Sequence, residues 1–302
     1  MSVVGLVVNP SAGSGEGTAV GRRAHRLLER AGHEVHDLSA PSLAQATDRA
    51  RQAQGLDALV VVGGDGMVHL GVDVVAGTDV PLGIVATGTG NDIARALHLP
   101  RGNVDRAVEV VDRALATGPR RIDAVRVTTT DGTHLDWYAG VLSCGLDAAV
   151  NARANTLTRL PGHLRYLAAL GPELARFRPY GYRVDVDGRT WESAGTLVAV
   201  ANTGWFGGGL PVAPDARPDD GLLDVVVAGP LTRTAALGIF PTIYRGRHVH
   251  HPRVEVLRGR RVTVEPLPAR GVAPPPAFAD GEHVAPLPLA AEVVPGALLV
   301  LC

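Results

Sequence analysis

The sequence contains no lysine, since all 29 of its basic residues are arginine. A catalytic lysine is therefore excluded, and a cationic contact to a phosphate group must come from arginine, histidine, a backbone N–H group or a metal ion. Cysteine is also scarce, because Cys144 and Cys302 alone give neither a disulfide framework nor a metal-ligand cluster. No apolar run approaches the roughly 20 residues that a membrane-spanning helix needs.

The formal net charge of -1 gives the chain no general attraction to nucleic acid or to an anionic bilayer. The N-terminus begins with an apolar strand pattern and lacks the charged leader and cleavage site of a signal peptide. We therefore expect a cytoplasmic protein without a nucleic-acid partner. Arg153, Arg159 and Arg165 alternate with leucines and could form a peripheral contact with the inner membrane face, although a packed helix pair explains them better. A homodimer is compatible with the sequence but not indicated by it.

In the part of the chain before Ile122, short apolar runs alternate with amphipathic stretches. The predicted strands are Val3–Val8, Glu34–Leu38, Leu56–Val62 and Pro81–Val85. The predicted helices are Thr18–Ala31, Leu43–Ala53, Met67–Ala76, Asp92–Leu97 and Val104–Ala116. This alternation predicts an α/β domain with a parallel sheet and helices on both faces.

After Ile122 the pattern changes to strands joined by hairpin signals. Asp131-Gly132 lies between the predicted strands Val125–Thr130 and Leu135–Leu142, and Asp187-Gly188 marks a second hairpin. The second half is therefore predicted to be mainly antiparallel β-structure with a few helices. We place the domain boundary near Ile122, so that residues 1–122 form the α/β domain.

Three glycine-rich turns follow three predicted strands. The segments are VVNPSAGSGEG from Val7, VVVGGDGM from Val60 and ATGTGNDIAR from Ala86. Such turns offer backbone N–H groups and helix N-termini to a phosphate. Asp65 would lie at the carboxyl end of a strand, where open α/β sheets place their ligands, and could hold Mg²⁺, orient a phosphate or cap a helix. The coincidence of three turns predicts one shared crevice.

The motifs NPSAG, GGDGM and GTGND, in this order, resemble the catalytic domain of the diacylglycerol kinase family, which includes bacterial lipid kinases and sphingosine kinases. WFGGGLPVAPDARPDDGLLDV from Trp205 and ADGEHV from Ala279 resemble the family's second-domain signatures. The resemblance implies an ATP-binding α/β domain and a β-sandwich lipid domain of residues 123–293, with residues 294–302 returning to the first domain. It also implies an active site between the domains.

The resemblance implies a role for individual residues. Glu282 matches the base that takes the proton from the acceptor hydroxyl, while Asp65 and Asp123 complete the catalytic set. A magnesium position matches Arg217, Asp220 and Leu222, with a carboxylate from Asp220 and main-chain oxygens from the other two. The implied ATP-binding residues are Asn9, Pro10, Ser11, Ala12, Gly13, Ser39, Gly64, Asp65, Gly66, Met67, Val68, His69, Leu70, Thr89 and Asn91.

One departure from the family pattern concerns the segment after GGDG. The family usually has Thr and Asn where this chain has Met67 and His69. We nevertheless expect an ATP- and Mg²⁺-dependent kinase that phosphorylates a lipid alcohol, because Asp65, Asp220 and Glu282 remain. Two alternatives stay open: a phosphotransferase like the NAD kinases, which share the GGDG turn, and a non-catalytic regulator that binds lipid or nucleotide.

Overall fold

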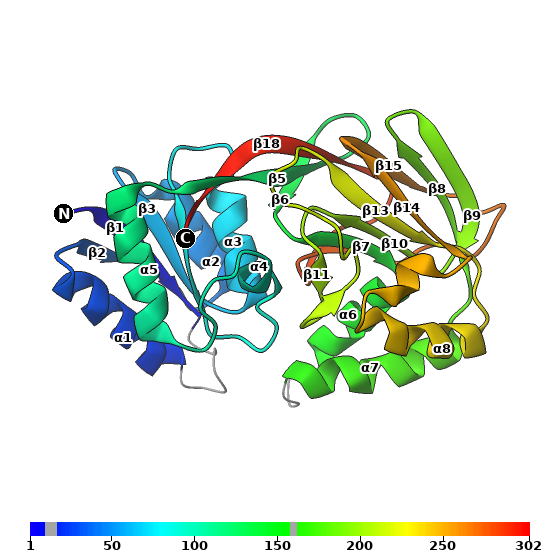
Figure 1. Cartoon of the computed structure of the whole chain (residues 1–302), viewed down its shortest axis with the longest axis horizontal. Helices are drawn as coiled ribbons and strands as arrows, with labels where there is room; N and C mark the ends of the chain where they lie inside the picture. Colours follow the sequence, from blue (N-terminus) through cyan, green and yellow to red (C-terminus); the bar gives the residue numbers. More distant parts are fainter. Residues whose placement is uncertain (10–16, 158–161) are drawn as a thin grey trace. The chain divides into compact units, whose positions relative to one another are not determined.

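A computed structural model describes residues 1–9, 17–157 and 162–302 of the chain. The chain divides into two compact units (Figure 1). Unit 1 consists of Met1–Ala124 and Pro295–Cys302, and unit 2 consists of Val125–Val294. The return of the last residues to unit 1 follows from β18 (Leu289–Leu301), whose residues Val300 and Leu301 pair with β4.

Unit 1 is built around parallel strands in the order β2-β1-β3-β4-β18. Its first four strands are β1 (Val3–Val8), β2 (Glu34–Asp37), β3 (Ala58–Gly63) and β4 (Leu82–Ala86). Its helices are α1 (Gly17–Arg30), α2 (Leu43–Gln52), α3 (Asp65–Val75), α4 (Asp92–Ala96) and α5 (Val104–Thr117). β3 is buried along its whole length, as its continuous apolar run predicts.

Helices cover both faces of this sheet (Figure 1). On one face, Leu28 of α1 and Val111 of α5 belong to the same apolar cluster as Val60 of β3. On the other face, Gly71 of α3 lies against Val61 of β3 and Leu82 of β4. Neighbouring residues of a strand point to opposite faces, so one apolar run serves both helix layers. The predicted α/β architecture is confirmed.

Unit 2 is the predicted antiparallel β-sandwich. One sheet has the order β14-β13-β10-β7-β16-β17, and the other contains β5, β6, β8, β9, β15 and the first part of β18. Its strands include β5 (Arg120–Thr128), β6 (His134–Tyr138), β7 (Val141–Gly145), β8 (Tyr180–Val186), β9 (Arg189–Gly195), β10 (Leu197–Ala201), β13 (Leu223–Ala228), β14 (Val254–Gly259), β15 (Arg261–Pro266), β16 (Ala277–Ala279) and β17 (Glu282–Ala285). Side chains from both sheets share one apolar core, which includes Leu142, Tyr182 and Val225.

Unit 2 also contains the short ribbon of β11 (Trp205–Phe206) with β12 (Leu210–Pro211), and helical segments among its described residues. The segments are α6 (Leu146–Thr156), α7 (Gly162–Arg176), α8 (Arg233–Ile243) and the 3₁₀ turn Arg247–His250. Arg153 of α6 bonds Glu173 of α7 at 3.0 Å, while Arg159 lies outside the described residues. Within the described residues no helix has the length and apolar character needed to cross a membrane.

One sequence prediction was wrong. Leu135–Leu142 is not a single strand, because the chain breaks at Ala139 and Gly140 between β6 and β7. Polar groups from elsewhere hold this break: Asp280 accepts bonds from both N–H groups, and the Asn202 side chain donates to the Ala139 carbonyl at 2.8 Å. These partners are remote in sequence, so the apolar pattern does not show the break.

Candidate active site

The ends of β3 and β4 meet through two glycines in unit 1. A Cβ atom built on Gly88 would lie 2.4 Å from the Cα atom of Gly64, a separation that real Cβ atoms do not show. The backbone N–H groups of Thr87 and Gly88 both donate to the Gly63 carbonyl. Glycine is therefore required at position 88 for the GGDG and GTGND turns to come together.

Asp65 ties these two turns through its carboxylate. Its Oδ2 accepts the Asn91 N–H and its Oδ1 accepts the Asp92 N–H, both at 2.7 Å. Asp65 begins α3 but caps α4, since these N–H groups lie at the first turn of α4. The capping alternative considered for Asp65 is thus observed, on a different helix from its own.

Asn91 completes the junction from the second turn. Its backbone is in the left-handed region, with a φ of 55°, which asparagine tolerates better than most residues. Its side chain accepts the Gly88 N–H at 3.1 Å and donates to the Gly88 carbonyl at 2.7 Å. Thr89 is left exposed between these anchors, as a residue that contacts a ligand should be.

The segment after GGDG turns its side chains into the core of unit 1, and the N–H groups of Met67 and Val68 donate to the Gly64 carbonyl. Met67, Val68, His69 and Leu70 are all buried in the first turns of α3. The Met67 side chain packs against Gly63, where a Cβ atom would lie 2.4 Å from the Met67 Cγ. The residue that replaces the family's usual threonine therefore fills the core of unit 1.

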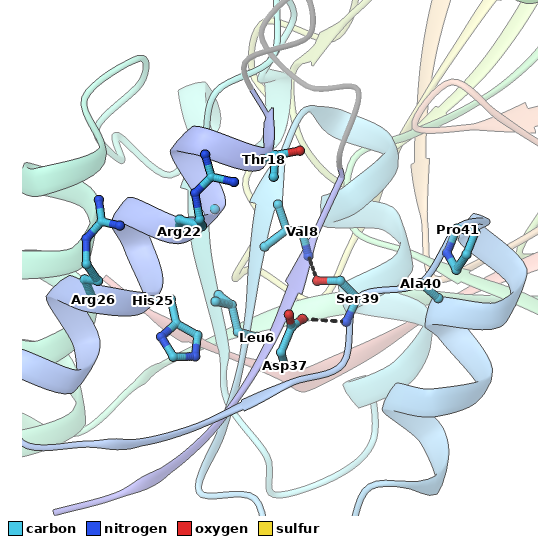
Figure 2. Close-up of a pocket in the computed structure, with 11 residues that line it drawn as sticks. Leu6, Val8, Thr18, Arg22, His25, Arg26, Asp37, Ser39, Ala40 and Pro41 are labelled. Atoms are coloured by element: carbon cyan, nitrogen blue, oxygen red, sulfur yellow. Dashed lines mark hydrogen bonds between the residues drawn. The ribbon is translucent and has the colours of Figure 1, made fainter.

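A pocket of about 650 Å³ lies beside the end of β1 in unit 1 (Figure 2). Ser39 lies on its wall, where its Oγ accepts the Val8 N–H at 3.0 Å and its own N–H donates to Asp37 at 2.9 Å. Arg22 and Arg26 from α1 line the same pocket. A pocket with two guanidinium groups and a fixed serine suits an anionic ligand with polar substituents.

Asn9 continues β1 past its last assigned residue, because its N–H donates to the Val62 carbonyl at 3.1 Å. The predicted ATP-binding residues Pro10, Ser11, Ala12 and Gly13 lie outside the described residues. Asp123 is buried near the end of unit 1, where its Oδ1 accepts the Gly296 N–H at 2.9 Å. This bond ties β5 to the returning segment of β18, and the catalytic role of Asp123 stays a prediction.

In unit 2, Glu282 stands at the start of β17, directly after a hairpin turn. The turn residues Asp280 and Gly281 have φ values of 52° and 89°, as a tight two-residue hairpin requires. Glu282 pairs with Ala279 across the hairpin and is partly buried. The Asp280 carboxylate accepts the N–H groups of Ala139, Gly140 and Val141, so the hairpin is fixed to the β6–β7 turn.

Asn202 holds the same β6–β7 turn from the opposite strand. It is fully buried at the end of β10, and its backbone N–H donates to the Gly140 carbonyl at 2.9 Å. Sequence reasoning did not select Asn202 or Asp280, yet both hold the turn against which the Glu282 hairpin packs. For Asn202 the available signal was an asparagine that ends an apolar run before Thr203, and for Asp280 it was the ADGEHV motif itself.

Asp220 lies in the turn before β13, with Arg217 and Leu222 on either side. Its Oδ1 accepts the Leu222 N–H at 3.1 Å, and its Oδ2 lies 2.5 Å from Nη2 of Arg258. In the described parts of the chain, no three His, Cys, Asp or Glu side chains gather as a metal site would need. The magnesium role of Arg217, Asp220 and Leu222 stays a prediction.

Comparison with known families assigns both units. Residues 3–127 match the model of the diacylglycerol kinase catalytic domain, and residues 140–302 match the YegS C-terminal NAD kinase beta sandwich-like domain. The chain belongs to the diacylglycerol kinase family of lipid kinases. The family membership expected from the five motifs is confirmed.

Other members of the diacylglycerol kinase family span the chain. A diacylglycerol kinase of Mycobacterium tuberculosis is 38% identical over 99% of this chain and 94% of its own length. A Xanthomonas oryzae protein described as a probable lipid kinase YegS-like is 30% identical over 68% of this chain and 66% of its own. A crystal structure of a diacylglycerol kinase from Bacillus anthracis has a TM-score of 0.70 at 19% identity, covers 99% and 96% of the two chains, and supports the fold.

Proposed function

We propose that the protein transfers the terminal phosphoryl group of ATP to the hydroxyl group of a diacylglycerol or a related lipid alcohol. The observation that carries this proposal is the 38% identity with a diacylglycerol kinase over 99% of the chain. Both units match models from lipid-kinase relatives, so neither half of the chain needs a separate explanation.

We assign nucleotide binding to unit 1. The pocket lined by Ser39, Arg22 and Arg26 supports the assignment, because guanidinium groups attract phosphates and this chain has no lysine to do so. The turn that contains Gly64, Asp65 and Gly66 and the turn that contains Thr89 and Asn91 would bound the triphosphate. ATP would enter as its magnesium complex, and the Asp65 carboxylate would hold the two turns together through the N–H groups of Asn91 and Asp92.

We assign the chemical step to Glu282. As the acceptor oxygen forms a bond to the terminal phosphorus, the bond between that phosphorus and the leaving ADP oxygen breaks, and the hydroxyl proton moves to the Glu282 carboxylate. The support is positional, because Glu282 is partly buried on a hairpin that Asp280 anchors with three backbone bonds. A fixed base is what such a reaction needs from the protein, since positioning dominates phosphoryl transfer.

We assign the lipid to unit 2. Beneath α6, α7 and α8 lies a cavity of about 90 Å³, which is lined mainly by apolar side chains such as Val150, Leu170 and Ile239. It is smaller than the roughly 150 Å³ cavity that holds a benzene ring, so it would receive the end of an acyl chain only if the helices move apart. An apolar wall favours a lipid acceptor over NAD, and a lipid acceptor implies peripheral contact with a membrane.

The burial of Met67 argues against the non-catalytic alternative. The Met67 side chain packs on Gly63 in the core, so it does not occupy the pocket beside β1 that we assign to the nucleotide. An active kinase is therefore preferred over a regulator that has lost its chemistry.

The experiment is an acceptor panel with ATP labelled in the terminal phosphate. The purified full chain is incubated with diacylglycerol in mixed micelles, a sphingoid base, NAD, a soluble polyol and water. We expect label in a chloroform-soluble lipid phosphate. Label in NADP would support the NAD kinase alternative, and label in no acceptor would support the regulator.

A further inference from the structure

Arg258 of β14 lies between two carboxylates at the turn that leads into β13. Its Nη2 is 2.5 Å from Oδ2 of Asp220, and its Nε is 3.2 Å from Oδ1 of Asp224. Asp224 and Arg258 are directly paired residues of the antiparallel strands β13 and β14. Cross-strand partners project from the same face, so the sheet register brings the guanidinium to the acidic turn.

The guanidinium supplies the counter-charge of this turn. It contacts the carboxylates of Asp220 and Asp224 at the same time, at 2.5 Å and 3.2 Å. Asp224 is almost fully buried, so a cation beside it is an electrostatic requirement.

The residues of this turn do not fit the magnesium position that the family resemblance implies. Magnesium requires oxygen ligands at about 2.0–2.1 Å in near-octahedral geometry. Of the two Asp220 carboxylate oxygens, Oδ1 accepts the Leu222 N–H and Oδ2 contacts Arg258. A magnesium ion on Oδ2 would share that atom with a permanent cation.

We propose that Arg258 takes the place of the metal ion at Asp220. Arginine stays charged at every physiological pH, and its planar fork reaches both carboxylates at once. The turn from Arg217 to Leu222 is then held to β14 without a divalent cation, and magnesium enters the enzyme only with ATP. The inference does not rest on the proposed reaction, because its consequence is a property of the folded protein without nucleotide.

The test is thermal unfolding of the nucleotide-free full chain in excess EDTA and in millimolar MgCl₂ or CaCl₂. A ligand that binds the folded state raises the melting temperature, so an ion at Asp220 would be visible as a shift. We expect no shift for the wild type. Arg258→Gln should melt lower in EDTA and recover with either cation, because removal of the guanidinium leaves the carboxylates available to the metal.

Two variants control this result. Arg258→Lys keeps a cation at the site and should remain insensitive to added metal, whereas the double variant Arg258→Gln with Asp220→Asn should lose the recovery. The proposal is overturned if Arg258→Gln does not respond to either cation. If Arg258→Gln does not fold, the wild type is compared with Asp220→Asn instead. The proposal is then contradicted if magnesium raises the melting temperature of the wild type and Asp220→Asn abolishes that rise, because the metal would then bind despite Arg258.

Discussion

The two units present opposite chemistry at their candidate sites. In unit 1 a single carboxylate, that of Asp65, organises two glycine turns, and the groups it arranges are backbone N–H donors. In unit 2 the proposed functional group is a partly buried carboxylate, that of Glu282, on a hairpin anchored by another carboxylate, that of Asp280. An anionic triphosphate needs donors, and a hydroxyl that must lose its proton needs an acceptor. The difference between the units therefore matches the two substrates of a kinase.

The units also differ in how they treat buried charge. Asp65 has both carboxylate oxygens bonded to backbone N–H groups, those of Asn91 and Asp92. Asp147 of α6 is fully buried in unit 2, and burial raises its pKa to about 6. Unit 1 gives its key carboxylate two N–H donors, whereas unit 2 places one beside an apolar cavity, where burial makes its ionisation costly. This contrast can be tested residue by residue.

The largest effect is expected for Glu282→Gln. The amide keeps the shape of the side chain but cannot take the acceptor's proton, so kcat for lipid phosphorylation should fall by about 10²–10⁴-fold. The measurement is steady-state lipid phosphate formation at saturating ATP. Glu265→Gln, at a partly exposed glutamate of β15 whose carboxylate lies 4.0 Å from Arg183, is the matched control and should retain its rate. Near-normal turnover of Glu282→Gln would show that Glu282 is not the base and is only part of the hairpin.

Asp147→Asn should stabilise unit 2 at neutral pH. The folded-state pKa of about 6 exceeds the unfolded value of 3.8, so the wild type loses stability as pH rises from about 4 to about 6 and does not regain it. The uncharged amide avoids this loss, which amounts to about 3 kcal/mol. Urea unfolding between about pH 4 and pH 7 checks the prediction. Parallel pH profiles for the two proteins would show that Asp147 does not carry the buried charge assigned to it.

The smallest effect is expected at the glycine junction of unit 1. Gly88→Ala places a Cβ atom 2.4 Å from the Gly64 Cα, so the two turns must separate. This should lower the free energy of unfolding by about 1–3 kcal/mol. Gly64→Ala meets its nearest atom, the Gly88 Cα, at 3.3 Å and should cost less. Chemical denaturation measures the free energy of unfolding of both variants and shows which glycine is the more important. Equal losses, or none, would mean that the junction adapts and that the glycines do not set its geometry.

Local patterns made the elements of unit 1 predictable, because each signal lies within one strand or helix. The strand β3 follows from its continuous apolar run, and in unit 2 the hairpin at Asp187-Gly188 follows from its turn residues. Contacts between distant residues were not predictable. Asp65 caps a helix 26 residues further on, and Arg258 meets Asp220 across 38 residues. α6 gave no clear helical stripe, since the buried residues of that helix include the charged Asp147.

The glycine-rich and acidic motifs did identify the candidate site. A site for phosphoryl transfer uses few residue types, and these occur here at strand ends and in hairpins. The roles within the motifs were less accessible. Whether an aspartate binds a metal, caps a helix or anchors a turn depends on which N–H groups reach it, as Asp65 and Asp280 show. Those N–H groups belong to other segments, so the sequence alone identifies the carboxylate but does not predict which groups it binds.

The division of labour between the units is tested most directly by calorimetric titration of MgATP into the wild type, Glu282→Gln and Asp65→Asn. Unit 1 should bind the nucleotide without help from Glu282, so Glu282→Gln should match the wild-type Kd. Asp65→Asn removes the charge and leaves one acceptor oxygen for two N–H donors, so it should weaken binding by about 10-fold or more. Weakened binding in Glu282→Gln together with unchanged binding in Asp65→Asn would contradict the account.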